Sequence, residues 1–91
     1  MKRIFKAVIF VSLLFLISCG NNPDKSRLYY DKGMDYLYHS QFEESIEYFD
    51  KAIKYDPENH EAYFYRGCAK YNIYQKEEAL SDYNRTRELN P

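Results

Sequence analysis

Paired glutamates are the most conspicuous candidates for chemistry in this chain. They occur twice, as Glu43-Glu44 and Glu77-Glu78. Adjacent residues on a helix point about 100° apart, so neither pair can present two carboxylates to one substrate as an acid–base dyad. Negative charge in the first turn of a helix instead complements the helix dipole. We therefore interpret both pairs as residues that begin a helix.

The cysteines and histidines do not form a reactive cluster by spacing. Cys19, Cys68, His39 and His60 lack the close ligand spacing of a structural zinc site. The sequence contains no Gly-rich phosphate loop and no serine elbow. The sequence therefore predicts no enzyme activity, no metal and no cofactor. We interpret the histidines as solvent-facing or helix-capping residues, and Cys68 as a small residue that fits its surroundings.

The N-terminus has the pattern of a secretory signal. Three of the first six residues are basic, and residues 7–17 are apolar apart from Ser12. A membrane-spanning helix needs about 20 apolar residues, more than this stretch supplies. Residues 1–18 are therefore expected to be a signal peptide, with a retained membrane anchor as the alternative.

The rest of the chain, from position 19 onward, is mildly acidic. Residues 1–18 hold 3 of the 13 basic and none of the 14 acidic side chains, which leaves 10 basic and 14 acidic ones and a formal net charge of −4. An acidic domain gains little from counterion release at phosphates, which argues against a nucleic-acid partner. All 11 tyrosines lie in this part, and such flat, amphipathic rings suit helix packing or a peptide-binding surface.

The segment Leu16-Ile17-Ser18-Cys19 resembles the lipobox of bacterial lipoproteins. The resemblance implies that the Cys19 thiol takes a diacylglyceryl group and becomes the acylated, palmitate-bearing N-terminus, a stable membrane anchor. Gly20 stands where many enterobacterial lipoproteins of the inner membrane have Asp. The implied location is therefore the cell envelope, at the outer membrane and facing the periplasm. The alternative is an ordinary Cys19 thiol that pairs with Cys68 in an oxidising compartment.

A regular period runs through the rest of the chain. Pro23, Pro57 and Pro91 are evenly spaced, and Gly33 and Gly67 are separated by the same interval. Further pairs match at this interval: Tyr29 and Tyr63, Tyr30 and Phe64, Glu43 and Glu77, Glu44 and Glu78, Ile46 and Leu80, and Phe49 and Tyr83. A set in register with a period of about 34 residues indicates a repeat protein.

Each repeat is predicted to hold two helices, from the spacing of its apolar residues. The expected helices span residues 24–39, 42–55, 61–73 and 77–89. Proline marks the junctions between units, because it cannot continue a helix.

Local signals predict how these helices end and how closely they pack. Asn59 is a predicted N-cap, and Ser40 with Glu43 has the spacing of a capping box. Gly33 and Gly67 lack a Cβ, so the second helix of each unit should approach closely. The aromatic side chains at positions 49 and 83 should fill the space between the paired helices.

The two units resemble the tetratricopeptide repeat. The matching residues are Tyr29, Gly33, Tyr36, Ser45, Phe49, Ala52 and Pro57 in the first unit, and Tyr63, Gly67, Ala79, Tyr83 and Pro91 in the second. The second unit departs from the pattern at Lys70 and Thr86. The resemblance implies an all-α fold with two helix-turn-helix units in a short α-solenoid. The expected organisation is a signal peptide at 1–18, the lipidated Cys19 and a linker at 19–25, and repeats at 26–59 and 60–91.

In this family, the face of each first helix that is not packed on its partner lines a concave groove for an extended peptide or a helix. Carried over by position, the groove set comprises Arg27, Tyr30, Asp31, Met34, Leu37, Tyr38, Glu61, Phe64, Tyr65, Cys68, Tyr71 and Asn72. The alternative is that neighbouring repeats or a partner copy bury some of these rings. Chaperone-binding members clamp a carboxylate with Lys and Asn where this chain has Tyr30 and Met34. The aromatic, nearly neutral surface instead favours an apolar or proline-containing peptide.

The sequence thus predicts a lipid-anchored adaptor that holds a protein or peptide partner of unknown identity near a membrane. The first alternative is structural: the chain self-associates into a homo-oligomer, or is the N-terminal part of a longer array. Repeats bury their faces against neighbours, and about three or more are normally needed for stability. An enzyme or enzyme subunit is the second alternative, and no constellation of residues supports it.

Overall fold

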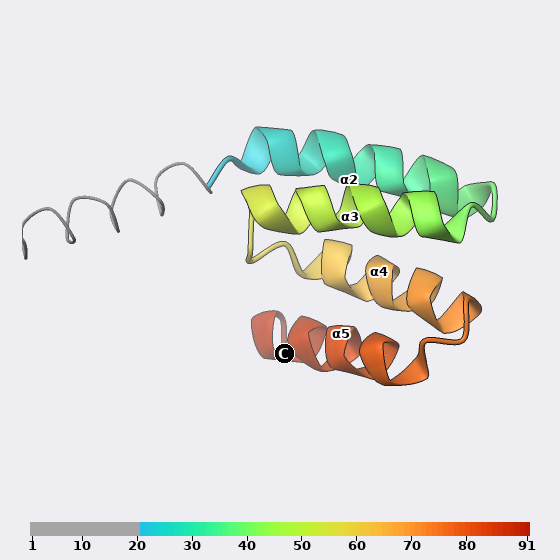
Figure 1. Cartoon of the computed structure of the whole chain (residues 1–91). Helices are drawn as coiled ribbons and strands as arrows, with labels where there is room; N and C mark the ends of the chain where they lie inside the picture. Colours follow the sequence, from blue (N-terminus) through green and yellow to red (C-terminus); the bar gives the residue numbers. More distant parts are fainter. Residues whose placement is uncertain (1–20) are drawn as a thin grey trace, which may run out of the picture.

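A computed structural model describes residues 21–91 as four helices without strands (Figure 1). The helices are α2 (Pro23–Tyr38), α3 (Phe42–Tyr55), α4 (His60–Asn72) and α5 (Lys76–Leu89). The expected all-α fold is confirmed, and the expected helix bounds agree with these to within one residue. The predicted signal peptide and Cys19 lie outside the described residues. Within residues 21–91, no helix is long and apolar enough to cross a membrane.

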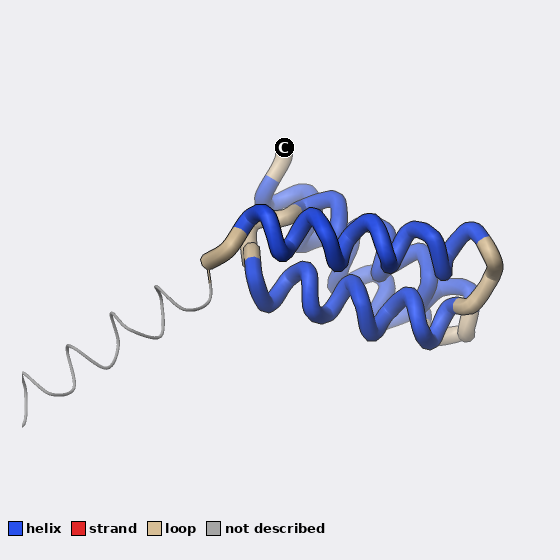
Figure 2. Tube along the Cα trace, turned by 90° about the horizontal axis from the view of Figure 1, so that it is seen from above, coloured by secondary structure: helices blue, strands red, loops and turns tan. Residues whose placement is uncertain are grey.

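The helices stack in one row, each antiparallel to the one before it (Figure 1). The pairs α2–α3 and α4–α5 pack most extensively, α3 also packs on α4, and α2 touches α4 only lightly. Figure 2 shows the row from above, with α2 and α3 side by side. Because α2 and α4 are the first helices of their pairs, their free sides can form one continuous surface.

Each pair closes where a glycine meets an aromatic ring. Phe49 has no exposed surface, and a Cβ added at Gly33 would lie 2.7 Å from its ring. A Cβ at Gly67 would lie 2.8 Å from the ring of Tyr83. The absence of a side chain at these positions therefore allows the close approach that the sequence predicts.

Helix ends follow some of the sequence signals and contradict one. The Asn59 side chain accepts the N–H of Ala62 at 3.1 Å, which confirms the predicted N-cap. The capping box at Ser40 is wrong, because the N-cap of α3 is Gln41 and no side-chain bond caps this helix. Ser40 instead adopts a φ of 58° in the turn after α2, and Tyr74 adopts 67° in the turn after α4. Both residues adopt the left-handed conformation, which glycine adopts most readily at the end of a helix.

The junction prolines have different roles. Pro23 is the first residue of α2, where its missing N–H costs nothing. Asn22 caps this helix by accepting the N–H of Lys25 at 3.1 Å. Pro57 lies in the turn between α3 and α4. Both prolines lie at a boundary of a repeat, as the sequence predicts, but α2 begins almost one turn earlier in the repeat than α4.

Replacing Gly33 by alanine is expected to destabilise the fold. Alanine raises intrinsic helix propensity by about 1 kcal/mol, but the new methyl group would meet the Phe49 ring at 2.7 Å. Overpacking a core costs about 1–3 kcal/mol, so we expect a net loss of about 1 kcal/mol. Urea unfolding of the full chain, followed by circular dichroism, measures the change. The added substitution Phe49→Leu should lessen the penalty of Gly33→Ala, and a Gly33→Ala variant more stable than the parent chain would contradict the packing argument.

Candidate partner-binding groove

The groove set lies entirely on α2 and α4, and its members differ in exposure. Exposed members are Arg27, Asp31, Tyr38, Glu61, Phe64, Tyr71 and Asn72. Met34, Leu37, Tyr65 and Cys68 are half-buried, and Tyr30 is buried. The exposed members leave a largely aromatic and polar surface along the first helices of both pairs.

Tyr30 connects the two helix pairs. Its side chain is 7% exposed, and its ring centroid lies 5.9 Å from that of Phe49 and 6.1 Å from that of Tyr65. Its hydroxyl donates to the Glu61 carboxylate at 3.4 Å. Burial, followed by the nearby charge of Glu61, raises the pKa of Tyr30 to about 12. The sequence left open whether a neighbouring repeat buries this ring. In the structure the second repeat does so, and Tyr30 packs between the two repeats.

The α4 part of the groove set carries an aromatic cluster that continues to the surface. The Phe64 ring centroid lies 5.1 Å from that of Tyr65 and 5.6 Å from that of Tyr83. Phe64 nevertheless stays 42% exposed, and Tyr71 is 56% exposed. Because two large rings stay accessible above packed ones, α4 offers preformed apolar contact area to a ligand.

Cys68 lies beneath this cluster as a half-buried free thiol. The Tyr83 hydroxyl donates to its sulfur at 3.7 Å. Burial, followed by this hydrogen bond, raises the pKa of Tyr83 to about 12. Across residues 21–91, no group of His, Cys, Asp and Glu side chains could hold a metal ion.

A hollow of 280 Å³ lies beside the groove set, between the start of α2 and the turn before α4. Its lining residues are Pro23, Arg27, Asp56, Glu58, Asn59, His60 and Glu61. Three carboxylates face one arginine here, and Arg27 already pairs with Asp31 at 3.5 Å. This end of the surface is therefore acidic.

Sequence reasoning missed an ionic network beneath α4. Arg66 donates to the Asp82 carboxylate at 2.7 and 2.9 Å and to Asp50 at 2.8 Å, and the Lys70 amine lies 3.1 Å from Asp82. Burial alone would lower the pKa of Arg66, but the two carboxylates outweigh it and raise the pKa. An alignment of the two repeats could have revealed this network. Asp82 stands at the position of Tyr48, and Lys70 stands at the position of Tyr36. The network connects α4 to α3 and α5 and so holds α4 in position.

Antiparallel helix pairs in a row, with a glycine closing each pair, define an α-helical repeat protein of the solenoid class. Two tetratricopeptide repeat family models match the chain, one at residues 26–59 and the other at residues 48–81. Together they cover more than half of the 91 residues. The chain therefore belongs to the tetratricopeptide repeat family.

Similar proteins include longer members of the same family. The human tetratricopeptide repeat protein 6 is 47% identical over 38 residues, which are 42% of this chain and 7% of that protein. The first TPR of Spaghetti (RPAP3), bound to the HSP90 peptide SRMEEVD, has a TM-score of 0.76 and 25% identity over 78% of this chain and 56% of its own. The TPR2AB domain of yeast Sti1, in complex with pHSP90, has a TM-score of 0.82 at 22% identity, over 99% of this chain and 34% of its own.

The raised pKa of Tyr30 predicts a pH-dependent stability. Its folded-state pKa of about 12 lies above the ordinary value of 10.0, so the folded protein holds this proton more tightly than the unfolded chain does. The resulting stability is complete below pH 10 and is lost as the pH rises toward 12. Urea midpoints of the full chain should therefore fall more steeply between pH 10 and 12 than those of Tyr30→Phe.

Tyr74→Phe is the control for this comparison, because Tyr74 is 88% exposed. Its midpoints should fall as steeply as those of the parent chain. If the urea midpoints of the parent chain and of Tyr30→Phe fell equally between pH 10 and 12, the Tyr30 proton would not contribute to the pH dependence of stability.

Proposed function

We propose that this chain is an interaction module that binds a peptide or helix of a partner protein along the free sides of α2 and α4. The observation that carries this proposal is the pair of exposed rings, Phe64 and Tyr71, on a helix fixed by packing from both sides. Aromatic anchors on a preorganised surface supply contact area at little cost in conformational entropy. The bound HSP90 peptide in the structure of the first TPR of Spaghetti supports a peptide-binding role for this fold.

The charges along the groove favour a partner that differs from an acidic C-terminal peptide. Arg27 is paired with Asp31, and Glu61 accepts from Tyr30, so these groups leave no free cation to clamp a carboxylate. The acidic hollow at the same end favours a basic side chain. The partner segment should therefore present apolar residues to α4 and a Lys or Arg toward Glu61.

Truncating the two exposed rings should weaken peptide binding. A displayed peptide library selected on the full chain supplies a ligand, and fluorescence polarisation measures its affinity. Phe64→Ala and Tyr71→Ala should each raise the Kd at least about tenfold, as expected for aromatic hot spots. Leu80→Ala is the control, because Leu80 on α5 is 58% exposed and lies outside the groove set.

Circular dichroism of both variants should match that of the parent chain. An unchanged Kd in both would exclude the groove as the binding surface, as would an equal loss with Leu80→Ala. Tyr30 is unsuitable for this test because its burial makes Tyr30→Ala a stability variant.

We further propose that a lipid on Cys19 holds this module at a membrane of the cell envelope, as a periplasm-facing protein of the outer membrane. The lipobox-like segment before Cys19 and the apolar N-terminus support this role. Asn22 already caps α2, so only residues 20 and 21 separate Cys19 from the cap. Since extended residues span at most about 3.6 Å each, the lipid would hold the helices close to the membrane surface.

Cys19→Ala should release the protein from membranes, because no thioether can then form at this position. Fractionation of cells that express the full chain, with immunoblotting of pellet and supernatant, measures the distribution. Cys68→Ala removes the other cysteine and should leave the protein in the membrane pellet. Equal membrane retention of Cys19→Ala and the parent chain would refute the lipid anchor.

A further inference from the structure

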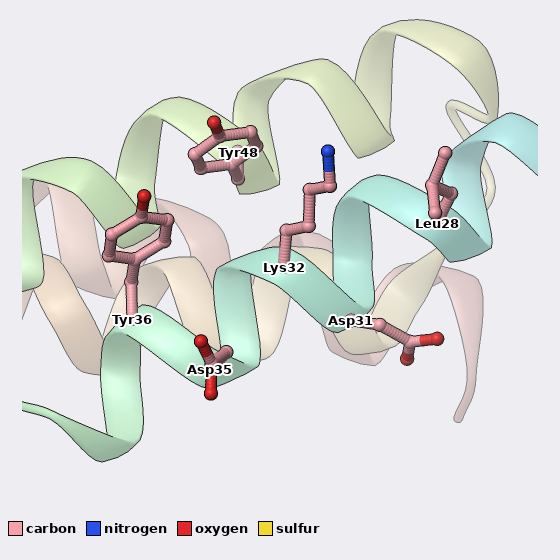
Figure 3. A pocket seen from close by; sticks show the side chains of 6 residues that line it. All are labelled: Leu28, Asp31, Lys32, Asp35, Tyr36 and Tyr48. Atoms are coloured by element: carbon pink, nitrogen blue, oxygen red, sulfur yellow. The ribbon is translucent and has the colours of Figure 1, made fainter.

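A stack of tyrosines covers one side of the α2–α3 pair. The ring centroids of Tyr36 and Tyr48 lie 5.3 Å apart at 8°, those of Tyr48 and Tyr29 lie 6.2 Å apart, and those of Tyr29 and Tyr55 lie 5.7 Å apart. Figure 3 shows two of these rings, Tyr36 and Tyr48, with the Lys32 side chain extending toward Tyr48, whose ring centroid lies 5.8 Å from the amine. We call the four rings, with Lys25, Lys32, Lys51 and Lys54, the tyrosine–lysine face.

The lysines of this face lack carboxylate partners within the described chain. Lys32 lies 6.0 Å from the Tyr29 ring centroid, and Lys51 lies 5.6 Å from it. Lys25 and Lys54 lie 5.2 and 5.9 Å from the Tyr55 ring. None of these four amines forms an ion pair among residues 21–91. An aromatic ring orients a cation but does not neutralise it, so these four amines keep their positive charge.

The second helix pair contains a similar arrangement, and there a neighbouring helix covers part of it. The second repeat has Tyr63 at the position of Tyr29, Arg66 at the position of Lys32 and Arg85 at the position of Lys51. The two guanidinium groups lie 5.3 and 6.0 Å from the Tyr63 ring centroid. Helix α3 packs on α4, and its Asp50 carboxylate lies 2.8 Å from Arg66. Within this chain, the covering element for such a face is therefore an amphipathic helix that carries a carboxylate.

We propose that the tyrosine–lysine face is a second docking surface, which binds an amphipathic helix of a partner protein whose carboxylate reaches Lys32 as Asp50 reaches Arg66. The pattern in α3 suggests what this helix should contain. Asp50 is followed three residues later by Ile53, which packs against the core. The partner helix should likewise present an acidic residue and an aliphatic residue one turn apart. The four rings and four lysines of this face are not members of the groove set, so this proposal does not rest on the proposed groove.

Two other occupants fit less well. A second copy of the chain would offer α5, which has Asn84 at the position of Asp50 and so supplies no carboxylate. An anionic lipid surface is flat and would leave unfilled the hollow of 440 Å³ at this face, whose lining includes Leu28, Tyr36 and Tyr48. A recess bordered by rings instead suits the side chains of a helix.

The test uses the isotope-labelled full chain with phosphatidylcholine nanodiscs present, and a peptide of residues 41–56 as the probe. A staple between peptide positions 43 and 47, both exposed in the chain, keeps it helical, because short helices are marginal in water. We expect saturable shifts of the amide signals of residues 28–36. Lys32→Met in the chain, or Asp50→Asn in the peptide, should weaken binding about two- to fivefold. Because both changes remove one contact, their effects should not add.

Lys76→Met is the control, because Lys76 is an exposed lysine on α5. It should leave the affinity unchanged. The proposal is overturned if the peptide does not shift these signals, or if Lys32→Met and Asp50→Asn act independently. It is also overturned if phosphatidylglycerol nanodiscs without peptide produce Lys32-dependent shifts at the same residues, because a lipid surface would then cover the face. None of these outcomes bears on Phe64 and Tyr71, so failure here is distinguishable from failure of the groove.

Discussion

The approach of a glycine to an aromatic ring within each helix pair is the constraint on which the rest of the structure depends. Glycine at position 33 destabilises the helix by about 1 kcal/mol relative to alanine. Because glycine has no side chain, the ring of Phe49 can pack against the helix backbone, where it has no exposed surface. Small buried residues complete the contact. The Ser26 hydroxyl donates to the Ala52 carbonyl at 2.7 Å, and so connects the start of α2 to α3. With the pair fixed in this way, the free side of its first helix can serve recognition.

Features that recur in both repeats could be predicted from the sequence, and features that depend on a neighbouring helix could not. Glycine and proline limit the local backbone, so the helices and the close approach at Gly33 followed from residue type and spacing. Spacing assigns a residue to a face of a helix but does not give its depth. Tyr30 is on the expected side of α2, yet Glu61 and Tyr65 of the next repeat determine its burial. Ser40 has the spacing of a capping box, but the turn after α2 places it in the left-handed conformation instead.

The two repeats solve the same packing problem with different chemistry. Between α4 and α5, Asp82 is 4% exposed and receives bonds from Arg66 and Lys70. A buried carboxylate is tolerable only when such partners compensate its desolvation. Between α2 and α3, the equivalent positions hold the stacked rings of Tyr36 and Tyr48, which need no compensating charge. The ion pairs occur in the second repeat, where α3 supplies a further carboxylate. The stacked rings occur in the first repeat, where no described helix covers the pair.

This difference gives the two surfaces of the domain opposite electrostatic character. The end of the groove is acidic around Glu61, whereas the tyrosine–lysine face carries uncompensated amines around Lys32. Like charges that face each other across an interface disfavour the wrong partner. A segment that suits one surface would therefore be rejected by the other. Both proposed surfaces use α2, and Asp31 of the groove set also lines the hollow at the tyrosine–lysine face, so this one helix would connect the two sites.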